Sequence, residues 1–349
     1  MKIGFFDHVE MAGKPLPTTF SERIRFVQEA DKAGVYCYHV AEHHATPLNS
    51  VPVPGVWLGA IAQATKQIKM GPLVYLLPLY SPLRLAEEIA ILDNLSGGRF
   101  EIGVGRGVSP FELNYHKVDH EKSRDIFFEA YECLMTALTG GDKFSFSGER
   151  YQYKDVPTPL RCVQSPTPPV WYASSNTTGS LWAGEHGMNF TTNGPTKRAL
   201  ENLNAFREGF AKRGGKAMKP KAEFKEGLAI GVLRQIVVAD TEAEARRIAE
   251  PANKHHHANI TWLMRLHQDS GLVTRLNVPL AGTYEDARRD GTLIAGTPDI
   301  VREEIEKLKH ETGINYLISY PFFGQMDFSD AMRSLTLFTR EVMPKIRDL

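Results

Sequence analysis

The sequence has few cysteines and no imbalance of charge. Its 349 residues include three cysteines, Cys37, Cys133 and Cys162, and none of them forms a CxxC pair. Cys37 falls in an apolar segment and Cys133 in a helical pattern, so we expect buried thiols. Lys plus Arg and Asp plus Glu number 41 each. This balance provides no basic surface field, so neither nucleic acid nor anionic lipid is expected as a partner.

Long apolar runs are also missing. No stretch reaches the roughly 18 apolar residues that a membrane-spanning helix needs. Asp7 and Glu10 fall where a signal peptide would require an apolar core. We therefore expect a cytoplasmic protein. The composition, 42% hydrophobic and 23% charged, is that of an ordinary globular protein.

Eight short apolar segments alternate with amphipathic segments along the chain. Such alternation needs parallel strands joined by helical crossovers, and eight units favour a closed (β/α)₈ TIM barrel over an open doubly wound sheet. We predict a single α/β domain over residues 1–349, with a surface hairpin inserted at about 140–168 and an aperiodic, glycine-containing stretch at 268–293. The expected strands are residues 2–6, 35–40, 68–77, 100–104, 169–173, 188–192, 227–239 and 315–320.

Polar residues follow two of these strands in patterns that suggest an anion site. In FEIGVGRGVSPFE, from Phe100, glycines alternate around Arg106, so the backbone can approach a ligand while the guanidinium binds a phosphate or carboxylate. The alternative is a rim arginine paired with a carboxylate. The segment ASSNTTGS, residues 173–180, enters a helix with more hydroxyls than capping needs. A phosphate held between the two segments is the prediction.

Histidines occur in two clusters, and we interpret them differently. His43 and His44 follow the second strand, where one of them can reach a pocket and transfer protons, and the other is expected to be structural. The run at residues 255–257 lies in a helical pattern, where consecutive side chains diverge by about 100° and cannot share a metal. We predict a largely solvent-exposed helix face there. No metal site is expected, and HxH or HExxH spacing is missing around His43.

The sequence resembles the bacterial-luciferase-like family of flavin-dependent monooxygenases, the alkanal monooxygenase-like proteins, over nearly its whole length. The resemblance includes KIGFF at the start, VAEHH, and the block PLVYLLPLYSPLRLAEEIAILDNLSGGRFEIGVGRG. It continues with PVWYASSNTTGSLWAGEHG and GTPDIVREEIEKLKHETGINYLI. It implies a TIM barrel, a homodimer in most members, that binds reduced FMN at the C-terminal ends of its strands.

The resemblance also assigns roles to residues. His43 matches the active-site histidine, Leu73-Val74 the place of a non-prolyl cis peptide beneath the flavin, and residues 268–293 a mobile lid. The positions that match cofactor-binding residues are Leu73, Val74, Gly105, Arg106, Gly107, Ser174, Ser175, Asn176 and Thr178. The positions that we place near the substrate are Phe6, Tyr75, Phe111 and Glu112.

The implied reaction is an oxygenation. A separate flavin reductase would supply reduced FMN, which reacts with O₂, as co-substrate, to a flavin hydroperoxide that oxygenates a small aldehyde, alkane or sulfur compound. The alternatives are a deazaflavin-dependent oxidoreductase on the same barrel, a non-catalytic flavin-binding protein, and a metal-dependent hydrolase. His43 argues mildly against the second, and the missing ligand spacing argues against the third.

Overall fold

Eight parallel strands form the barrel that the sequence predicts. The computed structural model describes residues 1–268 and 282–349. The strands are paired in the order β3-β2-β1-β12-β10-β9-β8-β5, and a parallel bridge between Met70 and Phe100 joins the two ends of this row. The barrel strands are β1 Lys2–Asp7, β2 Cys37–Val40, β3 Lys69–Pro72, β5 Ile102–Gly105, β8 Val170–Ala173, β9 Asn189–Thr192, β10 Ile230–Val238 and β12 Tyr316–Tyr320.

The third barrel strand is interrupted. After β3 the chain passes through a cis peptide bond between Leu73 and Val74, as the resemblance predicted, and continues as β4, Tyr75–Leu76, which pairs with β5. Glycine is required where β3 meets its neighbour, because a Cβ on Gly71 would lie 2.0 Å from the carbonyl oxygen of Glu101. The interruption lies at the C-terminal end of β3, directly after Pro72.

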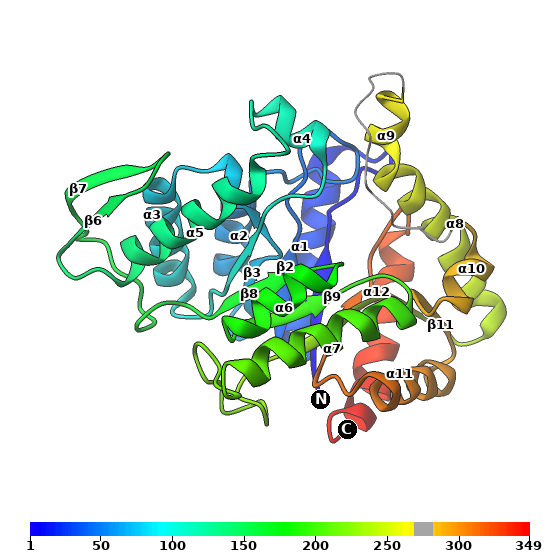
Figure 1. Ribbon diagram of the computed structural model, residues 1–349. Coiled ribbons are helices and arrows are strands. Elements are labelled where there is room, and N and C mark those ends of the chain that lie inside the picture. The colour runs from blue at the N-terminus through cyan, green and yellow to red at the C-terminus, as the bar shows by residue number, and fades with distance from the viewer. Residues whose placement is uncertain (269–281) are drawn as a thin grey trace.

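Helices surround the barrel, and a hairpin projects from it (Figure 1). The hairpin consists of β6, Lys143–Ser147, and β7, Gln152–Pro157, which pair antiparallel inside the predicted insertion. Among the described residues, no helix is long and apolar enough to cross a bilayer. The helices that cover the barrel are α1 Leu16–Lys32, α2 Pro54–Ala64, α3 Pro82–Ser96, α5 Ser123–Thr139, α6 Thr177–Glu185, α7 Thr196–Lys212, α8 Glu242–Ile260, α11 Pro298–Thr312 and α12 Phe328–Leu337.

Several elements differ from the sequence prediction. A first helix is expected over residues 22–33, after the capping candidates Thr19 and Ser21, but the helix begins at Leu16, because prolines are tolerated in a first helical turn. The short helix α4, Pro110–Tyr115, was not predicted. The apolar pattern of residues 241–266 predicts one long helix, but the chain forms two, α8 and α9, Trp262–Leu266. The last helix contains a π-helical turn at Phe338–Val342.

Part of the predicted lid is regular structure. Residues 269–281 lie outside the described residues, so the prediction of a lid is not tested there. Beyond them the chain forms α10, Tyr284–Arg289, and β11, Leu293–Gly296, an additional strand that pairs with β10. The sequence analysis missed β11 because its four residues are too few to show a period.

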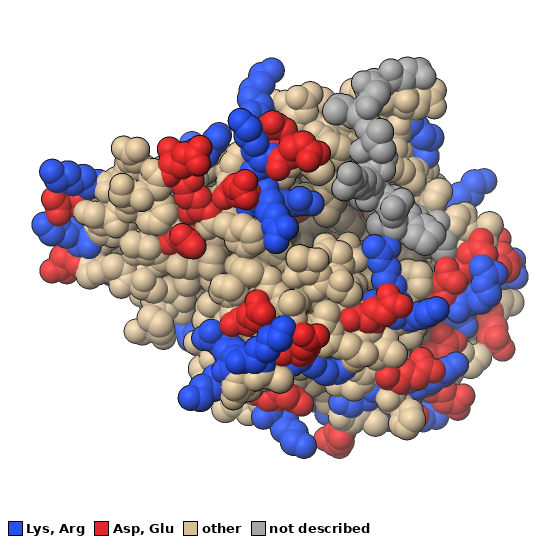
Figure 2. Space-filling view, in the orientation of Figure 1, with Lys and Arg blue, Asp and Glu red and all other residues tan. Residues whose placement is uncertain are grey.

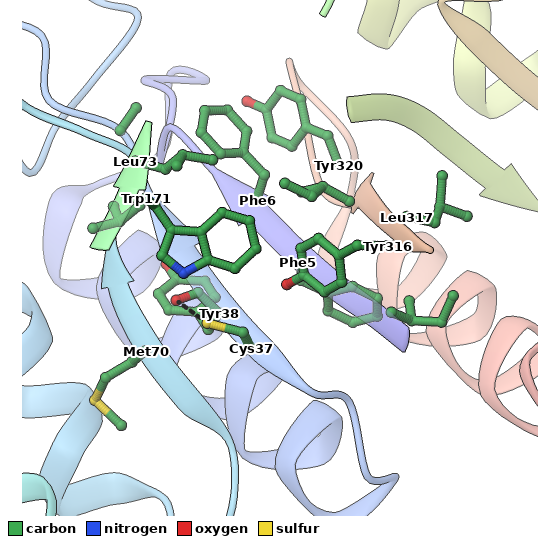
Figure 3. Close-up of a cluster of buried hydrophobic side chains, with 14 of the residues drawn as sticks. Phe5, Phe6, Cys37, Tyr38, Met70, Leu73, Trp171, Tyr316, Leu317 and Tyr320 are labelled. Atoms are coloured by element: carbon green, nitrogen blue, oxygen red, sulfur yellow. Dashed lines mark hydrogen bonds between the residues drawn. The ribbon is translucent and has the colours of Figure 1, made fainter. Parts of the chain in front are cut away.

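Aromatic and polar side chains fill the N-terminal end of the barrel. Figure 3 shows Trp171 and Tyr316 lying between the strands, and both are fully buried. The buried Glu101 carboxylate accepts hydrogen bonds from Trp171 Nε1 and, at 2.6 Å, from Lys221 Nζ. His39 Nε2 lies 2.9 Å from the hydroxyl of Tyr316. We call this group, Glu101, Lys221, Trp171, His39 and Tyr316, the barrel floor.

Candidate active site

A cavity of about 370 Å³ lies at the C-terminal ends of the strands. Its walls come from residues at or after the ends of β1, β2, β3, β5, β8, β9 and β12, from β10, and from α8 and α9. Figure 2 shows a hollow in the molecular surface with lysine and arginine side chains along its edge. The barrel thus brings together segments that are distant in the sequence, at the end where enzymes of this architecture carry their active sites.

His43 lies in the cavity wall and is held by a carboxylate. Its Nδ1 is 3.1 Å from Oε1 of Glu112, which belongs to α4, and the second oxygen of Glu112 accepts the backbone N–H of His44 at 2.9 Å. Burial lowers the pKa of His43, but the charge and hydrogen bond of Glu112 outweigh it, so the pKa is raised. For Glu112 burial acts in the opposite direction and raises the pKa. The charges and hydrogen bonds of His43 and His44 outweigh this effect, so the pKa of Glu112 is lowered. Glu112 therefore fixes Nδ1 of His43 and leaves Nε2 for a ligand.

His44 has the structural role that was expected of one of the two histidines. Its Nε2 lies 2.8 Å from Oε1 of Glu42, whose other oxygen accepts the N–H of Leu76 and the hydroxyl of Tyr80. Glu42 is 2% exposed. It therefore connects the loop after β2 to the interrupted third strand, which keeps His43 in place.

Arg106 is a cation in the cavity wall, and the described residues place no carboxylate against it. It follows β5 between Gly105 and Gly107, and all three residues line the cavity. Among the described residues no carboxylate lies within ion-pair distance of its guanidinium, so the rim salt bridge weighed in the sequence analysis is not formed there. Burial raises the pKa of Tyr172 on the neighbouring β8, and the charge of Arg106 opposes that shift.

The predicted phosphate-binding turn lies beside Arg106. Ser174, Ser175 and Asn176 line the cavity. The side chain of Asn176 caps α6 by accepting from Gly179 N at 2.9 Å, and the hydroxyl of Ser174 donates to the Asn176 carbonyl. Thr178 is exposed and outside the cavity lining, so its side chain is not placed where it was predicted. Because first-turn amides have no intrahelical acceptor, this turn can still offer N–H groups to an anion.

The apolar part of the wall contains most of the predicted residues. Leu73 and Val74 line the cavity, as do Phe6 and Phe111, and Glu112 lies there as the partner of His43. The prediction for Tyr75 is wrong. Its side chain is fully buried outside the cavity, and its hydroxyl donates to Glu88 at 2.8 Å. This contact with Glu88, a residue of α3, could not be derived from the sequence.

Sequence reasoning missed a second polar wall. His8, directly after β1, is 7% exposed, and its ring lies 5.4 Å from that of His43 and 5.7 Å from that of His256. Burial, followed by the neighbouring histidines, lowers the pKa of His8 well below its usual value. Its Nδ1 is enclosed and has no hydrogen-bond partner among the described residues. A polar pair, Asp7-His8, at the end of the first strand was the available signal.

The histidine run at 255–257 is not the solvent-exposed face that was predicted. All three residues are half-buried, and His256 and His257 line the cavity. His256 Nδ1 lies 2.8 Å from the buried carboxylate of Glu10. Ligand atoms of His8, Glu10 and His256 lie within 4.8 Å of one another, a spacing that could suit a cation. Glu10 already accepts four protein donors, however, so we do not assign a metal site.

The structure is a TIM barrel whose cavity, at the C-terminal ends of the strands, contains Arg106 and a carboxylate-held histidine. A family model for luciferase-like monooxygenases matches residues 1–316. The chain therefore belongs to the luciferase-like monooxygenase family, whose members are oxidoreductases, as the resemblance indicated.

Relatives cover nearly the whole chain. An uncharacterized protein, y4wF, of Sinorhizobium fredii is 34% identical over 99% of this chain and 97% of the relative. The oxygenase component of a flavin-dependent trigonelline monooxygenase of Acinetobacter baylyi is 25% identical over 99% of this chain and 95% of its own length. Both are full-length matches, so the family applies to the whole barrel.

Solved structures share the fold. Monooxygenase RslO1 of Streptomyces bottropensis superposes with a TM-score of 0.85 at 23% identity and covers 99% of both chains. The oxygenating constituent of 3,6-diketocamphane monooxygenase of Pseudomonas putida, in complex with FMN, gives 0.79 at 22%, covering 99% of this chain and 98% of its own. An F420-dependent secondary alcohol dehydrogenase gives 0.73 at 18%, covering 99% of both chains. At these identities the likeness concerns the fold alone.

Proposed function

We propose that this chain is the oxygenase of a two-component system, which takes reduced FMN from a separate reductase and uses O₂ to oxygenate a small organic substrate. The observation that carries the proposal is Arg106, a cation that pairs with no carboxylate of residues 1–268 and 282–349, in the same cavity as the carboxylate-held His43. A cavity with both groups suits a phosphate-bearing redox cofactor and a proton transfer beside it. The trigonelline relative is named as an oxygenase component, which supports a separate reductase.

The residues present fit FMN. Arg106, Ser175 and the first turn of α6 would hold the phosphate, and Leu73 and Val74 offer an apolar surface for the flavin ring. When bound, reduced FMN supplies the electrons that activate O₂. Neither a metal ligand set nor a nucleophile is needed for this chemistry.

Two groups of the chain would act during turnover. His43, with Nδ1 held by Glu112, would hold or move a proton through Nε2 at the reacting atoms. Phe6 and Phe111 would cover the substrate and limit the access of water, which otherwise diverts such reactions to peroxide. Aldehydes, alkanes and sulfur compounds stay the proposed substrate classes, and a cytoplasmic location and a single domain over 1–349 stay predictions.

The first test is a stopped-flow experiment. The protein is mixed with reduced FMN without oxygen and then with oxygenated buffer. We expect a transient near-ultraviolet band that outlives the band of free FMN under the same conditions. Peroxide release is measured in parallel and is expected to fall when an accepted substrate is added. Immediate reoxidation at the rate of free FMN would contradict the proposal.

A deazaflavin-dependent hydride transfer is the second candidate. The observation that favours it is the fold shared with F420-dependent enzymes. Titration of the protein with deazaflavin and with FMN separates the two, because a barrel built for hydride transfer to deazaflavin would bind it more tightly than reduced FMN.

A flavin-storage protein would bind FMN, and substitution of His43 would then leave its behaviour with O₂ unchanged.

We also propose a homodimer through α2 and α3, which pack against each other. Their outer surface exposes Val56 (76%), Ile91 (49%) and Leu95 (47%), and exposed apolar groups on adjoining helices are typical of a protein interface. Sedimentation should give twice the 39.1 kDa of the chain. Val56→Glu should shift the mass to that of the monomer, whereas Val108→Glu, at an exposed valine elsewhere, should not. A monomeric wild-type protein would contradict the dimer.

A further inference from the structure

His256 and His43 are held in the same way on different walls of the cavity. Each ring uses Nδ1 to contact a buried glutamate, Glu10 for His256 and Glu112 for His43. The Nδ1–H of each ring donates to the carboxylate, so Nε2 is the nitrogen that remains for a ligand, and it can donate to that ligand when the imidazole is protonated. His43 follows β2, whereas His256 belongs to α8, so the two rings approach the cavity from separate elements.

Glu10 is a fixed anion behind His256. It is fully buried and accepts from His256 Nδ1 at 2.8 Å, Asn259 Nδ2 at 2.8 Å, Tyr320 OH at 2.6 Å and the N–H of Gly324 at 2.9 Å. Burial raises its pKa, but the charge and hydrogen bond of His256 outweigh burial, and the pKa is lowered. Such a network orients the imidazole and prevents it from rotating.

Gln235 provides a second polar atom on the same wall. It lies on β10, lines the cavity and is 7% exposed. Its Oε1 accepts from Asn253 Nδ2 at 3.0 Å, so its amide nitrogen is the free end, and that nitrogen has no partner among the described residues. Asn253 precedes His256 by three residues on α8, so both lie on the helix face that contacts the barrel. A buried N–H donor without a partner indicates a ligand that accepts a hydrogen bond.

This wall lies across the barrel from the anion site. In the order of the strands, β10, β12 and β1 carry Gln235, Tyr320 and His8, whereas β5 and β8 carry Arg106 and the turn after residue 173. Ile260, Leu263 and Met264 contribute apolar side chains to the same wall. A polar pair in an apolar pocket, away from the phosphate site, has the composition of a substrate site.

We propose that Gln235 Nε2 and, in the protonated form of its ring, His256 Nε2 donate hydrogen bonds to a carbonyl oxygen of the substrate and so form a subsite for it. This inference rests on the proposed function in one respect, because it takes the ligand that binds at this wall to be the substrate. Glu10 and Asn253 are then positioning residues, because each fixes one of the two donors without touching the ligand. His8, a buried neutral ring between His256 and His43, separates this subsite from the proton-transfer residue.

The test compares two probes of the same shape. Cyclohexanone carries the carbonyl oxygen, and methylenecyclohexane replaces it with CH₂. Binding to the flavin-free protein is measured by calorimetry, and the carbonyl stretch of bound cyclohexanone by infrared difference spectroscopy. The wild-type protein should bind the ketone at least fivefold more tightly and shift its stretch to lower frequency, because hydrogen-bond donors polarise the carbonyl.

Matched variants identify the donors. Gln235→Glu keeps the shape but removes the N–H donor, and should abolish the preference for the ketone and most of the frequency shift. A glutamine at 256 places its amide near the position of Nε2, whereas an asparagine places it near Nδ1. His256→Gln should therefore retain more of the preference than His256→Asn. His255→Gln is the control on the same helix, because His255 contacts the Met11 carbonyl, and it should behave as wild type.

The outcomes are decisive and independent of flavin chemistry. Equal binding of both probes by the wild type, absence of binding, or an unchanged stretch in Gln235→Glu would each overturn the subsite. Equal losses for both probes in His256→Asn and His256→Gln would show that the ring only packs. If instead the subsite is found but the stopped-flow transient is not, the proposed reaction fails while the subsite stands.

Discussion

The two ends of the barrel bury polar side chains in opposite ways. At the floor, Glu101 is bound by Lys221 and Trp171, and His39 by Tyr316. At the cavity, enclosed polar atoms of His8, Thr191 and Gln235 have no partner among the described residues. Each unpaired buried polar group costs about 1–3 kcal/mol of folding free energy. The cavity therefore carries an unfavourable contribution to stability, the cavity deficit, that the floor does not. The difference distinguishes polar residues that stabilise the fold from polar residues whose atoms are available to bind a ligand.

The largest effect should come from breaking the floor. Lys221→Met leaves the buried Glu101 carboxylate without its 2.6 Å partner, and we expect a loss of about 3–5 kcal/mol in the free energy of unfolding, the usual cost of a buried charge without its partner. Urea denaturation measures it. Lys143→Met is the control, because its pair with Asp155 is exposed, and it should cost under about 1 kcal/mol. Similar losses in both variants would contradict the structural role of the floor.

At the cavity, the analogous change should affect turnover rather than folding. His43→Ala should lower turnover by about 10²–10⁴-fold, the range for a lost acid or base, and leave unfolding nearly unchanged. Glu112→Gln removes the charge that raises the pKa of His43, so the limb of the pH–rate profile that reports this histidine should move to lower pH. An unmoved limb would show that another group sets it, and normal coupled turnover in His43→Ala would refute its role.

The smallest effect tests the cavity deficit itself. Thr191→Val removes a buried hydroxyl that has no partner, so the protein should gain up to about 1 kcal/mol of stability. Thr65→Val is the matched change at a satisfied hydroxyl, which donates to the Ile61 carbonyl at 2.7 Å and accepts from Arg99, and it should lose about 1 kcal/mol or more. Thermal unfolding of both variants distinguishes them. A loss in Thr191→Val equal to that in Thr65→Val would remove the contrast between the two ends.

The barrel and one half of the cavity could be predicted from the sequence. Alternating apolar and amphipathic segments predicted eight parallel strands, and glycines around Arg106 predicted a cation beside a close backbone approach. These features depend on neighbours in sequence. Resemblance, rather than physical reasoning, supplied the cis peptide and the role of His43.

The other half of the cavity could not be predicted, because its residues meet only through the tertiary fold. Glu10 and His256 are 246 residues apart and share one hydrogen bond. Periodicity placed His256 on a helix but not the barrel wall that the helix covers. The prediction for Tyr75 was wrong for a similar reason, because its hydroxyl donates to Glu88 of α3 and the side chain does not line the cavity. Such contacts depend on registers and turns that one sequence does not reveal.

The most direct measurement of the central claim is an anaerobic titration with reduced FMN and reduced riboflavin, which differ by the phosphate. If Arg106 is a cation reserved for that phosphate, Arg106→Ala should weaken FMN binding by about 1.5–3 kcal/mol, the scale of a charged hydrogen bond. The same variant should change riboflavin binding little. Equal weakening of both ligands, or unchanged binding of FMN, would contradict the claim that Arg106 binds the phosphate of FMN in the cavity.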